Sequence, residues 1–327
     1  MIRSKRFRLS TSLAAGLSLA SLGLAALPAR AADKVTISQA FQSMLYLPFY
    51  VAMDAGFFAG EGVEVTKETA GAPAVALSAV ISKSAQYSIH GPEWTAIAAS
   101  KGAPVNVVAN VVNGAAVWIA TAPDVTFNDV KDLKGQKIVT GLMPTTSTSL
   151  FLKLLKENGL KPEDVEMTQV QLGSEPGPLL AGQAKIAVMY EPGLDQVVAK
   201  GMKVVLSFPE RYGPYAFSAV SARKDVDPAV TQKVVSGLQK AIRFMHAEPD
   251  KTVAIAKKQF PNLDPAVVEA AVRRMMREKV YPDSVDITAE ALKTGMETQV
   301  ALGNLSALPD YATFVRRDFI EKSLAAN

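Results

Sequence analysis

The chain has 327 residues, of which 49% are hydrophobic and 20% charged, and it contains no cysteine and two histidines. This length suffices for two domains or one large one, and the composition is that of a packed globular protein rather than a disordered one. The lack of cysteine excludes disulfide bonds, and with so few histidines we expect no transition-metal site and no metal cofactor.

The N-terminal 31 residues account for the formal net charge of +4. They hold five of the 35 Lys and Arg residues and no acidic residue, which leaves 30 basic against 31 acidic residues in the rest of the chain. A basic start, an apolar run over 9–27 and the sequence Ala29-Arg30-Ala31 are typical of a secretory signal peptide, so we expect cleavage before Ala32. The balanced remainder favours no nucleic-acid partner. We expect a periplasmic protein without a lipid anchor, because such an anchor needs a cysteine.

Strands and helices alternate in the first part of the expected mature chain. The predicted strands are 35–38, 63–65, 86–89 and 105–112. The predicted helices between them lie near 48–55, 74–82 and 93–100. Pro48 stands at a first helical position, where a missing N–H costs nothing, and Gly56 can take the left-handed conformation that ends a helix.

The same alternation returns in the next part of the chain. The predicted strands are 137–140, 165–170, 186–189 and 204–206. The predicted helices lie near 149–158, 178–183 and 193–200. Strands separated by helices favour parallel sheets with right-handed crossovers. Two such runs in one chain predict two similar lobes.

Beyond residue 208 the pattern changes. A turn at 212–215 leads to a predicted strand over 216–222 that returns to the first lobe, and the rest is helical, with Asp227, Asp264 and Thr288 as helix caps. The sequence therefore predicts an α/β protein with lobe I formed by 32–121 and 216–327 and lobe II by 122–215. The two crossings, near 118–122 and 214–217, would form a two-stranded hinge that allows closure on a ligand.

Six loops follow the carboxyl ends of these strands, where open α/β sheets bind ligands. They are 41–46, 71–74 and 90–94 in lobe I, and 144–149, 174–178 and 190–193 in lobe II. None of them contains Lys or Arg. Their acidic side chains are Glu93, Glu175 and Glu191, and their aromatic side chains include Tyr46, Trp94 and Tyr190.

This composition leaves alternatives open. Aromatic walls with carboxylate acceptors suit a flat, nitrogen-bearing ligand, but Glu93 and Glu191 can also simply favour their helix N-termini. Four hydroxyls at 145–148 precede or begin a helix and can bind an anion or a carbonyl oxygen, although one of them can serve as the helix cap. His90 either contacts the ligand or is a structural histidine, and Arg211 near the hinge could turn toward an anion.

Several stretches together carry a resemblance to a known family. They are SQAFQSMLYLPFYVAMDAGFFAGEGVEV at 38–65, SAQYSI at 84–89, DLKGQKI at 132–138, EP at 191–192, GPY at 213–215 and FPNLDP at 260–265. In this order and spacing they resemble the periplasmic solute-binding proteins of ABC importers, in the branch for nitrate, sulfonates, taurine and thiamine-pyrimidine precursors.

The resemblance implies a type II-like periplasmic-binding-protein fold, with a mostly parallel sheet flanked by helices in each lobe. It implies a monomer without catalytic activity that captures a small solute between the lobes and delivers it to an ABC permease at the inner membrane. The ligand-contacting residues that it implies are Gln42, Ser43, Tyr46, Glu93, Trp94, Asn113, Thr145, Thr146, Ser147, Glu191 and Tyr215.

The family alone does not name the solute. The charge of the loops favours a small nitrogen-containing organic compound, such as a pyrimidine-like heterocycle, over an alkanesulfonate or nitrate. Two alternatives of another class remain. One is a pyrimidine-precursor synthase, which depends on a cysteine-rich motif and active-site histidines, whereas this chain has no cysteine and begins with an expected export signal. The other is a periplasmic sensor module that reports its ligand to a membrane receptor.

Overall fold

The structure is a computed structural model that describes residues 31–143 and 145–326. The predicted signal peptide, apart from its last residue, lies outside the described residues. Residues 32–327 form one compact unit. Among the described helices, none combines the length and the apolar character that a membrane crossing requires.

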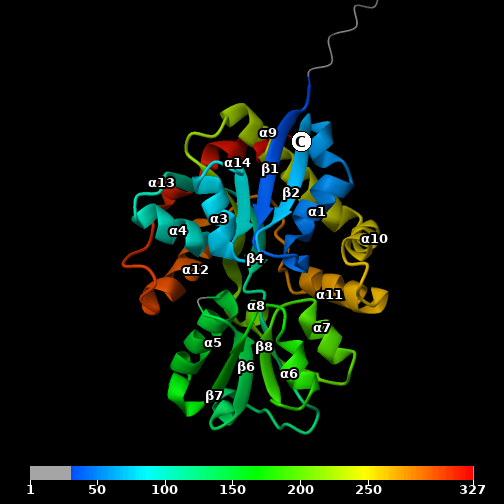
Figure 1. Ribbon diagram of the computed structural model, residues 1–327, viewed down its shortest axis with the longest axis vertical. Coiled ribbons are helices and arrows are strands. Elements are labelled where there is room, and N and C mark those ends of the chain that lie inside the picture. Colours follow the sequence, from blue (N-terminus) through cyan, green and yellow to red (C-terminus); the bar gives the residue numbers. More distant parts are fainter. Residues whose placement is uncertain (1–30, 144, 327) are drawn as a thin grey trace, which may run out of the picture. The chain divides into compact units, whose positions relative to one another are not determined.

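The described residues contain two five-stranded sheets, with strand orders β2-β1-β3-β10-β4 and β7-β6-β8-β5-β9. We call the part that holds the first sheet lobe I and the part that holds the second lobe II (Figure 1). The strands of the first sheet are β1 Asp33–Gln39, β2 Val63–Thr69, β3 Tyr87–His90, β4 Val105–Gly114 and β10 Pro214–Arg223. The strands of the second are β5 Trp118–Thr121, β6 Lys137–Gly141, β7 Glu166–Val170, β8 Ile186–Met189 and β9 Lys203–Ser207.

Helices flank both sheets (Figure 1). In lobe I they are α1 Leu47–Asp54, α2 Phe57–Gly60, α3 Pro73–Ile81, α4 Pro92–Ser100, α9 Pro228–Ala247, α10 Pro249–Gln259, α11 Pro265–Arg277, α12 Ala289–Ala301, α13 Tyr311–Phe314 and α14 Arg317–Ala325. In lobe II and the chain that leaves it they are α5 Thr146–Glu157, α6 Pro176–Leu180, α7 Gly193–Val198 and α8 Phe208–Tyr212. The expected caps form: Asp227, Asp264 and Thr288 each accept a hydrogen bond from a backbone N–H of the helix that follows.

The mostly parallel α/β fold predicted from the sequence is confirmed, with one antiparallel strand inserted in each sheet. In the first sheet, β10 runs antiparallel to its neighbours β3 and β4. In the second, β5 runs antiparallel to β8 and β9. Each lobe thus receives one strand from across the hinge, and the two lobes have the same arrangement.

The position of the first crossing differs from the prediction. We expected it near 118–122, with residues up to 121 in lobe I, but Trp118–Thr121 is a strand of the second sheet and the chain crosses just before it, after β4. Trp118 pairs with Met189 and Ser207, which lie about seventy and ninety residues further along the chain. No local sequence pattern reveals such a pairing. From the sequence alone, this strand therefore cannot be distinguished from a continuation of the preceding apolar run.

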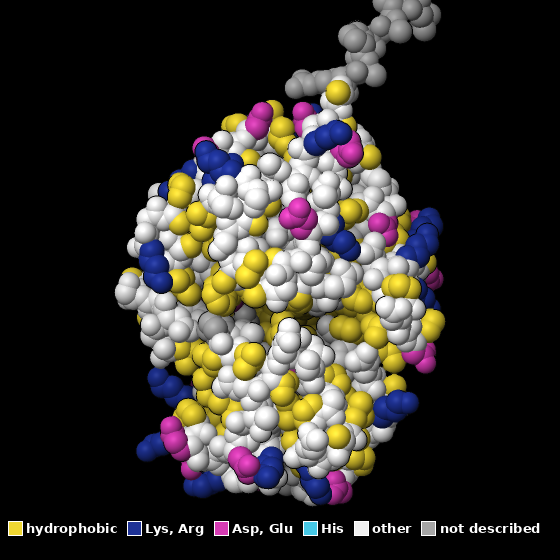
Figure 2. All heavy atoms as spheres, viewed as in Figure 1, with side chains coloured by type: hydrophobic (Ala, Val, Ile, Leu, Met, Phe, Trp, Pro, Cys, Tyr) yellow, Lys and Arg dark blue, Asp and Glu magenta, His cyan; other side chains and the backbone are white. Residues whose placement is uncertain are grey.

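The strand ends position the site. β1 and β3 of lobe I end at Gln39 and His90, and β6 and β8 of lobe II end at Gly141 and Met189. The loops and helix starts that follow them are the segments that line the space between the lobes. On the face drawn in Figure 2, mainly hydrophobic and uncharged side chains gather along the junction between the lobes.

Candidate functional site

Two neighbouring cavities lie between the lobes. The larger has a volume of about 360 Å³, within the range of small-molecule sites. It is lined by Phe41, Gln42, Ser43 and 259–263 from lobe I, and by Leu172, Gly173, Glu175, 190–193 and Gln196 from lobe II. The smaller has about 20 Å³ of free space and is lined by Phe41, Tyr46, Pro73, Gly91, Glu93, Trp94, Thr145, Thr146, Leu172, Tyr190, Phe217 and Ser218. Phe41, Leu172 and Tyr190 belong to both walls, so the cavities are two parts of one cleft.

The lining of both cavities contains carboxyl, amide, hydroxyl and aromatic side chains but no Lys or Arg. Lys67 is not part of this lining but contacts it: its Nζ donates to the side-chain oxygens of Gln42 and Gln259, each at 3.2 Å. Burial lowers the pKa of this lysine. As in the six loops, the side chains that line the assembled cleft include acidic groups and no basic one.

Glu93 links the two lobes in the smaller cavity. Its side chain is buried at the start of α4, and its Oε1 accepts a hydrogen bond of 2.9 Å from Thr146 Oγ1, at the start of α5 in lobe II. Burial raises the pKa of Glu93 to about 7, against the lowering effect of this bond and of a backbone N–H. Gly91 makes room for the carboxyl, since a Cβ at that position would collide with both of its oxygens.

The hydroxyls at the start of α5 are largely engaged with protein groups. Thr148 Oγ1 hydrogen-bonds to Thr140 Oγ1 at 2.6 Å, and the hydroxyls of Thr145 and Ser147 lie 3.2 Å apart. The Ser147 backbone N–H donates to the Tyr190 hydroxyl at 2.8 Å. An anion at this helix start would have to compete with Tyr190.

Tyr190 stands between two acidic groups. Burial is the main cause that raises the pKa of its hydroxyl, and the nearby Glu175 and Glu93 raise it further. Its ring packs edge-on against Phe217, with 5.8 Å between the ring centres. The tyrosine thus offers an aromatic wall to both parts of the cleft while its hydroxyl is held by α5.

Glu191 lines the larger cavity, but its carboxyl group is already paired with protein groups. We expected its carboxylate to meet the ligand, but Oε1 lies 2.9 Å from Arg274 Nε of α11, and Oε2 accepts the backbone N–H of Asp195 at 3.0 Å. Burial and the neighbouring Asp195 raise the pKa of Glu191, while the Arg274 guanidinium opposes this rise. Arg274 also contacts Asp195 at 2.7 Å, so it holds two buried carboxylates of lobe II from lobe I.

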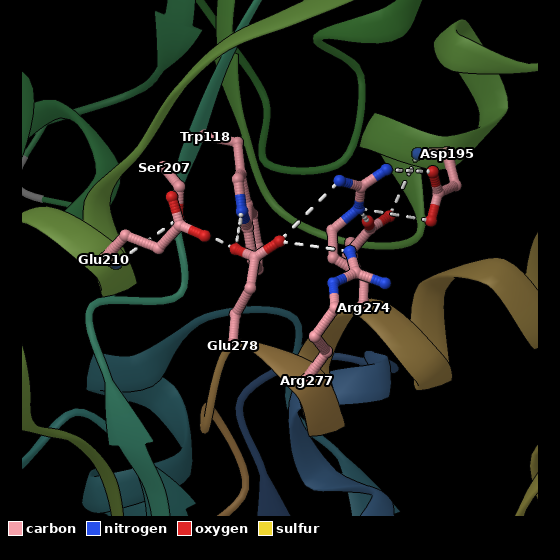
Figure 3. A network of polar contacts seen from close by, with 8 residues as sticks. Trp118, Asp195, Ser207, Glu210, Arg274, Arg277 and Glu278 are labelled. Atoms are coloured by element: carbon pink, nitrogen blue, oxygen red, sulfur yellow. Dashed lines mark hydrogen bonds and ion pairs between the residues drawn. The ribbon is translucent and has the colours of Figure 1, made fainter.

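Glu278, just beyond α11, extends this network to the second sheet (Figure 3). Its Oε2 accepts the Trp118 indole N–H at 2.7 Å and the Ser207 hydroxyl at 2.8 Å. Arg274 and Glu278 therefore join the lobes through polar contacts that the sequence analysis did not predict.

The other predicted residues are distributed as follows. Gln42 and Ser43 line the larger cavity, and Tyr46, Trp94, Thr145 and Thr146 line the smaller one. Ser147 is fully buried and lines neither cavity.

Two predicted residues lie away from both cavities. Asn113 lines a separate cavity of about 380 Å³ beside Arg277 and Pro209. Tyr215 is buried against α12, where its hydroxyl lies 3.4 Å from the Gly295 carbonyl oxygen. The structure thus brings most of the predicted set to the cleft and leaves these two outside it.

His90 and Arg211, whose contact with the ligand the sequence analysis left open, also lie outside the cleft lining. His90 is fully buried, with its ring nitrogens 2.9 Å from Ser88 Oγ and from the Gly91 carbonyl oxygen, and burial lowers its pKa to about 4. Arg211 lies 3.8 Å from Glu157. His90 therefore has the contacts of a neutral structural histidine.

Sequence reasoning missed one wall of the larger cavity, residues 259–263 between α10 and α11. The segment belongs to the C-terminal helical region, and its only signal was the FPNLDP stretch that takes part in the family resemblance. Within the described residues, no group of three or more His, Cys, Asp or Glu side chains could hold a metal ion.

Comparisons with known proteins agree with this architecture. A putative binding protein of Bacillus subtilis, YtlA, is 26% identical over 88% of this chain and 89% of its own length. The alkanesulfonate-binding protein SsuA of Xanthomonas axonopodis, solved with bound MOPS, has a TM-score of 0.69 at 18% identity and covers 88% of this chain and 99% of its own. The desulfurization enzyme DSZB has a TM-score of 0.68 at 13% identity and covers 90% and 99%. These two structures share the fold with this chain, and one binds a solute while the other is an enzyme.

The family itself follows from the sequence. Residues 44–252, more than half of the chain, match the NMT1/THI5-like family. The matched range includes every strand except β1, and all of the smaller cavity's lining except Phe41, but it leaves out 41–43 and 259–263 of the larger cavity. The chain therefore belongs to the NMT1/THI5-like family.

Proposed function

We propose that this protein is the solute-binding component of an ABC importer, and that it captures a small nitrogen-containing organic compound between its two lobes. It would act in the periplasm after removal of residues 1–31 and deliver the compound to a permease in the inner membrane. The family, the two-lobed fold and the similarity to YtlA support a binding protein.

One observation carries the choice of solute. The walls of both cavities contain the carboxyl groups of Glu93, Glu175 and Glu191 and no basic side chain. Arg274 balances the charge of Glu191, but an anion in this cleft would still lose its hydration while facing Glu93 and Glu175, which is unfavourable. A neutral or cationic nitrogen heterocycle would instead stack on Phe41 or Tyr190 and donate hydrogen bonds to carboxyl and amide oxygens.

The cleft also supports binding by closure. Each cavity is lined by residues of both lobes, so a ligand held there is desolvated from two sides. Binding would favour the closed arrangement, because only that arrangement provides the contacts of both walls.

A small anion is the second candidate, favoured by the hydroxyl groups at the start of α5 and by the similarity to SsuA. The Ser147 N–H is already bonded to Tyr190, and Glu93 accepts the Thr146 hydroxyl beside it. An enzyme of the pyrimidine-precursor synthase type would need a cysteine-rich motif, and the chain has no cysteine. A periplasmic sensor would bind its ligand by the same contacts but meet a receptor instead of a permease.

A thermal-shift screen of the purified mature protein tests the solute class. We expect 4-aminopyrimidine-type heterocycles or organic amines to raise the melting temperature, because a ligand at a hundred times its Kd stabilises the folded state by about 2.7 kcal/mol. Nitrate, methanesulfonate and ethanesulfonate at the same ionic strength are the comparison set. Stabilisation by these anions, with none by the nitrogen compounds, would contradict the proposal.

A further inference from the structure

Glu175 differs from the other acidic groups of the cleft in its hydrogen bonding. It lines the larger cavity just before α6 and is only 1% exposed. Its Oε1 is buried and has no hydrogen-bond partner. Buried polar groups are nearly always paired, so an unpaired carboxyl oxygen in a cavity wall calls for an explanation.

The neighbouring carboxyl groups are paired with protein. Glu93 accepts the Thr146 hydroxyl, Glu191 contacts Arg274 and the Asp195 N–H, and Asp195 contacts Arg274. These contacts explain their burial without a ligand. Glu175 has no such partner for Oε1, although it lies in the same wall as Glu191.

Gly141 marks the place where Glu175 meets the start of α5. A Cβ built on Gly141 would lie 2.9 Å from Thr145 Oγ1, 3.2 Å from Ser147 Oγ and 3.3 Å from Glu175 Oε1. Three side-chain oxygens thus gather over a residue without a side chain. Oxygen atoms in this arrangement suit a group that donates several hydrogen bonds.

We propose that Glu175 is the carboxyl group that recognises the ligand, accepting an N–H from an amine or a protonated ring nitrogen that also reaches the hydroxyl of Thr145. This inference rests on the proposed function. It gives to Glu175 the ligand-binding role that the sequence analysis gave to Glu191. Arg274 holds Glu191 in place, whereas Glu175 Oε1 has its hydrogen-bonding capacity unused.

The electrostatics of the wall agree with this assignment. Burial raises the pKa of Glu175 to about 7, above the ordinary value of 4.5, and two backbone N–H groups only partly oppose the rise. The titratable groups on the elements around it are Tyr190, Glu191 and Asp195, and Arg274 contacts the last two. A cationic ligand would supply the charge partner that Glu175 lacks.

The first arm of the test needs no ligand. Because the folded-state pKa is raised, the stability that protonated Glu175 contributes is complete below about pH 4.5 and is lost as the pH rises through 7. Glu175→Gln removes this loss, so we expect the variant to melt about 2 °C or more above the wild type at pH 8 and at nearly the same temperature at pH 4. Glu163→Gln, the same change at an exposed site of lobe II, is the control and should match the wild type at both pH values.

The second arm uses 4-aminopyrimidine and an organic amine as probes in isothermal titration. We expect Glu175→Gln to weaken their binding about tenfold or more, and Glu163→Gln to leave it unchanged. Circular dichroism confirms that both variants are folded.

The outcomes separate this inference from the proposed function. A lower melting temperature of Glu175→Gln than of the wild type at pH 8 would show that the carboxylate has a partner in the protein and would overturn the inference. Equal binding of the nitrogen probes by wild type and Glu175→Gln would overturn the inference and leave the proposed function standing. Failure of every nitrogen probe to bind the wild type would overturn both.

Discussion

Replacement of Arg274 with methionine is expected to lower the free energy of unfolding by about 3 kcal/mol at pH 8. The Arg274 side chain is 15% exposed, and its guanidinium contacts the buried carboxyl groups of Glu191 and Asp195. Methionine keeps much of the aliphatic volume but leaves both acidic groups without their cation. Urea denaturation followed by tryptophan fluorescence measures the loss.

The loss should depend on pH in a defined direction. Arg274 opposes the rise in the pKa of Glu191, so without it this carboxyl takes up a proton at a higher pH. Protonation removes the unpaired charge, and the destabilisation should therefore be smaller at pH 5 than at pH 8. Arg277→Met on the same helix is the control, because its side chain is 65% exposed and its loss should cost less than about 0.5 kcal/mol. Equal stability of the two variants at pH 8 would contradict the role of Arg274.

Replacement of Trp118 with alanine is expected to lower the free energy of unfolding by about 4 kcal/mol, because a fully buried indole leaves a large cavity in the second sheet. Trp118→Phe separates packing from hydrogen bonding. It retains a ring but leaves Glu278 Oε2 without the indole N–H, so we expect a loss of about 2 kcal/mol. Chemical denaturation followed by circular dichroism, which does not depend on the lost tryptophan, measures both values.

Glu278→Gln is the matched change on the other side of this hydrogen bond. The amide oxygen can still accept the indole N–H, so the variant should be less destabilised than Trp118→Phe. If Trp118→Phe had the stability of the wild type, the contact between the indole and Glu278 would contribute nothing to joining the lobes.

Local patterns were enough to predict most of the fold. Proline at helix starts, aspartate caps and apolar runs marked α4, α9 and α11 and the strands from β1 to β4 within a few residues. The pairing of Trp118–Thr121 could not be predicted in this way, because strand membership depends on partners far along the chain. The antiparallel direction of this strand and of β10 likewise follows from how the chain crosses the hinge.

The positions of site residues could be predicted where they follow the ends of strands. They could not be predicted where they depend on side chains far along the chain. Glu93, Thr146 and Tyr46 lie in the cleft because their loops follow parallel strands. Glu191 also follows such a strand, but Arg274, 83 residues later, takes its carboxylate. Asn113 and Tyr215 lie on strands near the hinge, where the side-chain direction of each residue decides which cavity it reaches. The sequence was enough to predict which acidic side chains lie in the cleft, but not which of them are paired with basic side chains.

A crystal structure of the mature protein with its tightest-binding solute from the screen tests the central claim most directly. The account predicts density for a nitrogen-containing compound in the larger cavity, in contact with Phe41 and Tyr190 and with an N–H within hydrogen-bonding distance of Glu175. A sulfonate or nitrate bound at the start of α5, or a solute in the cavity beside Asn113, would contradict it.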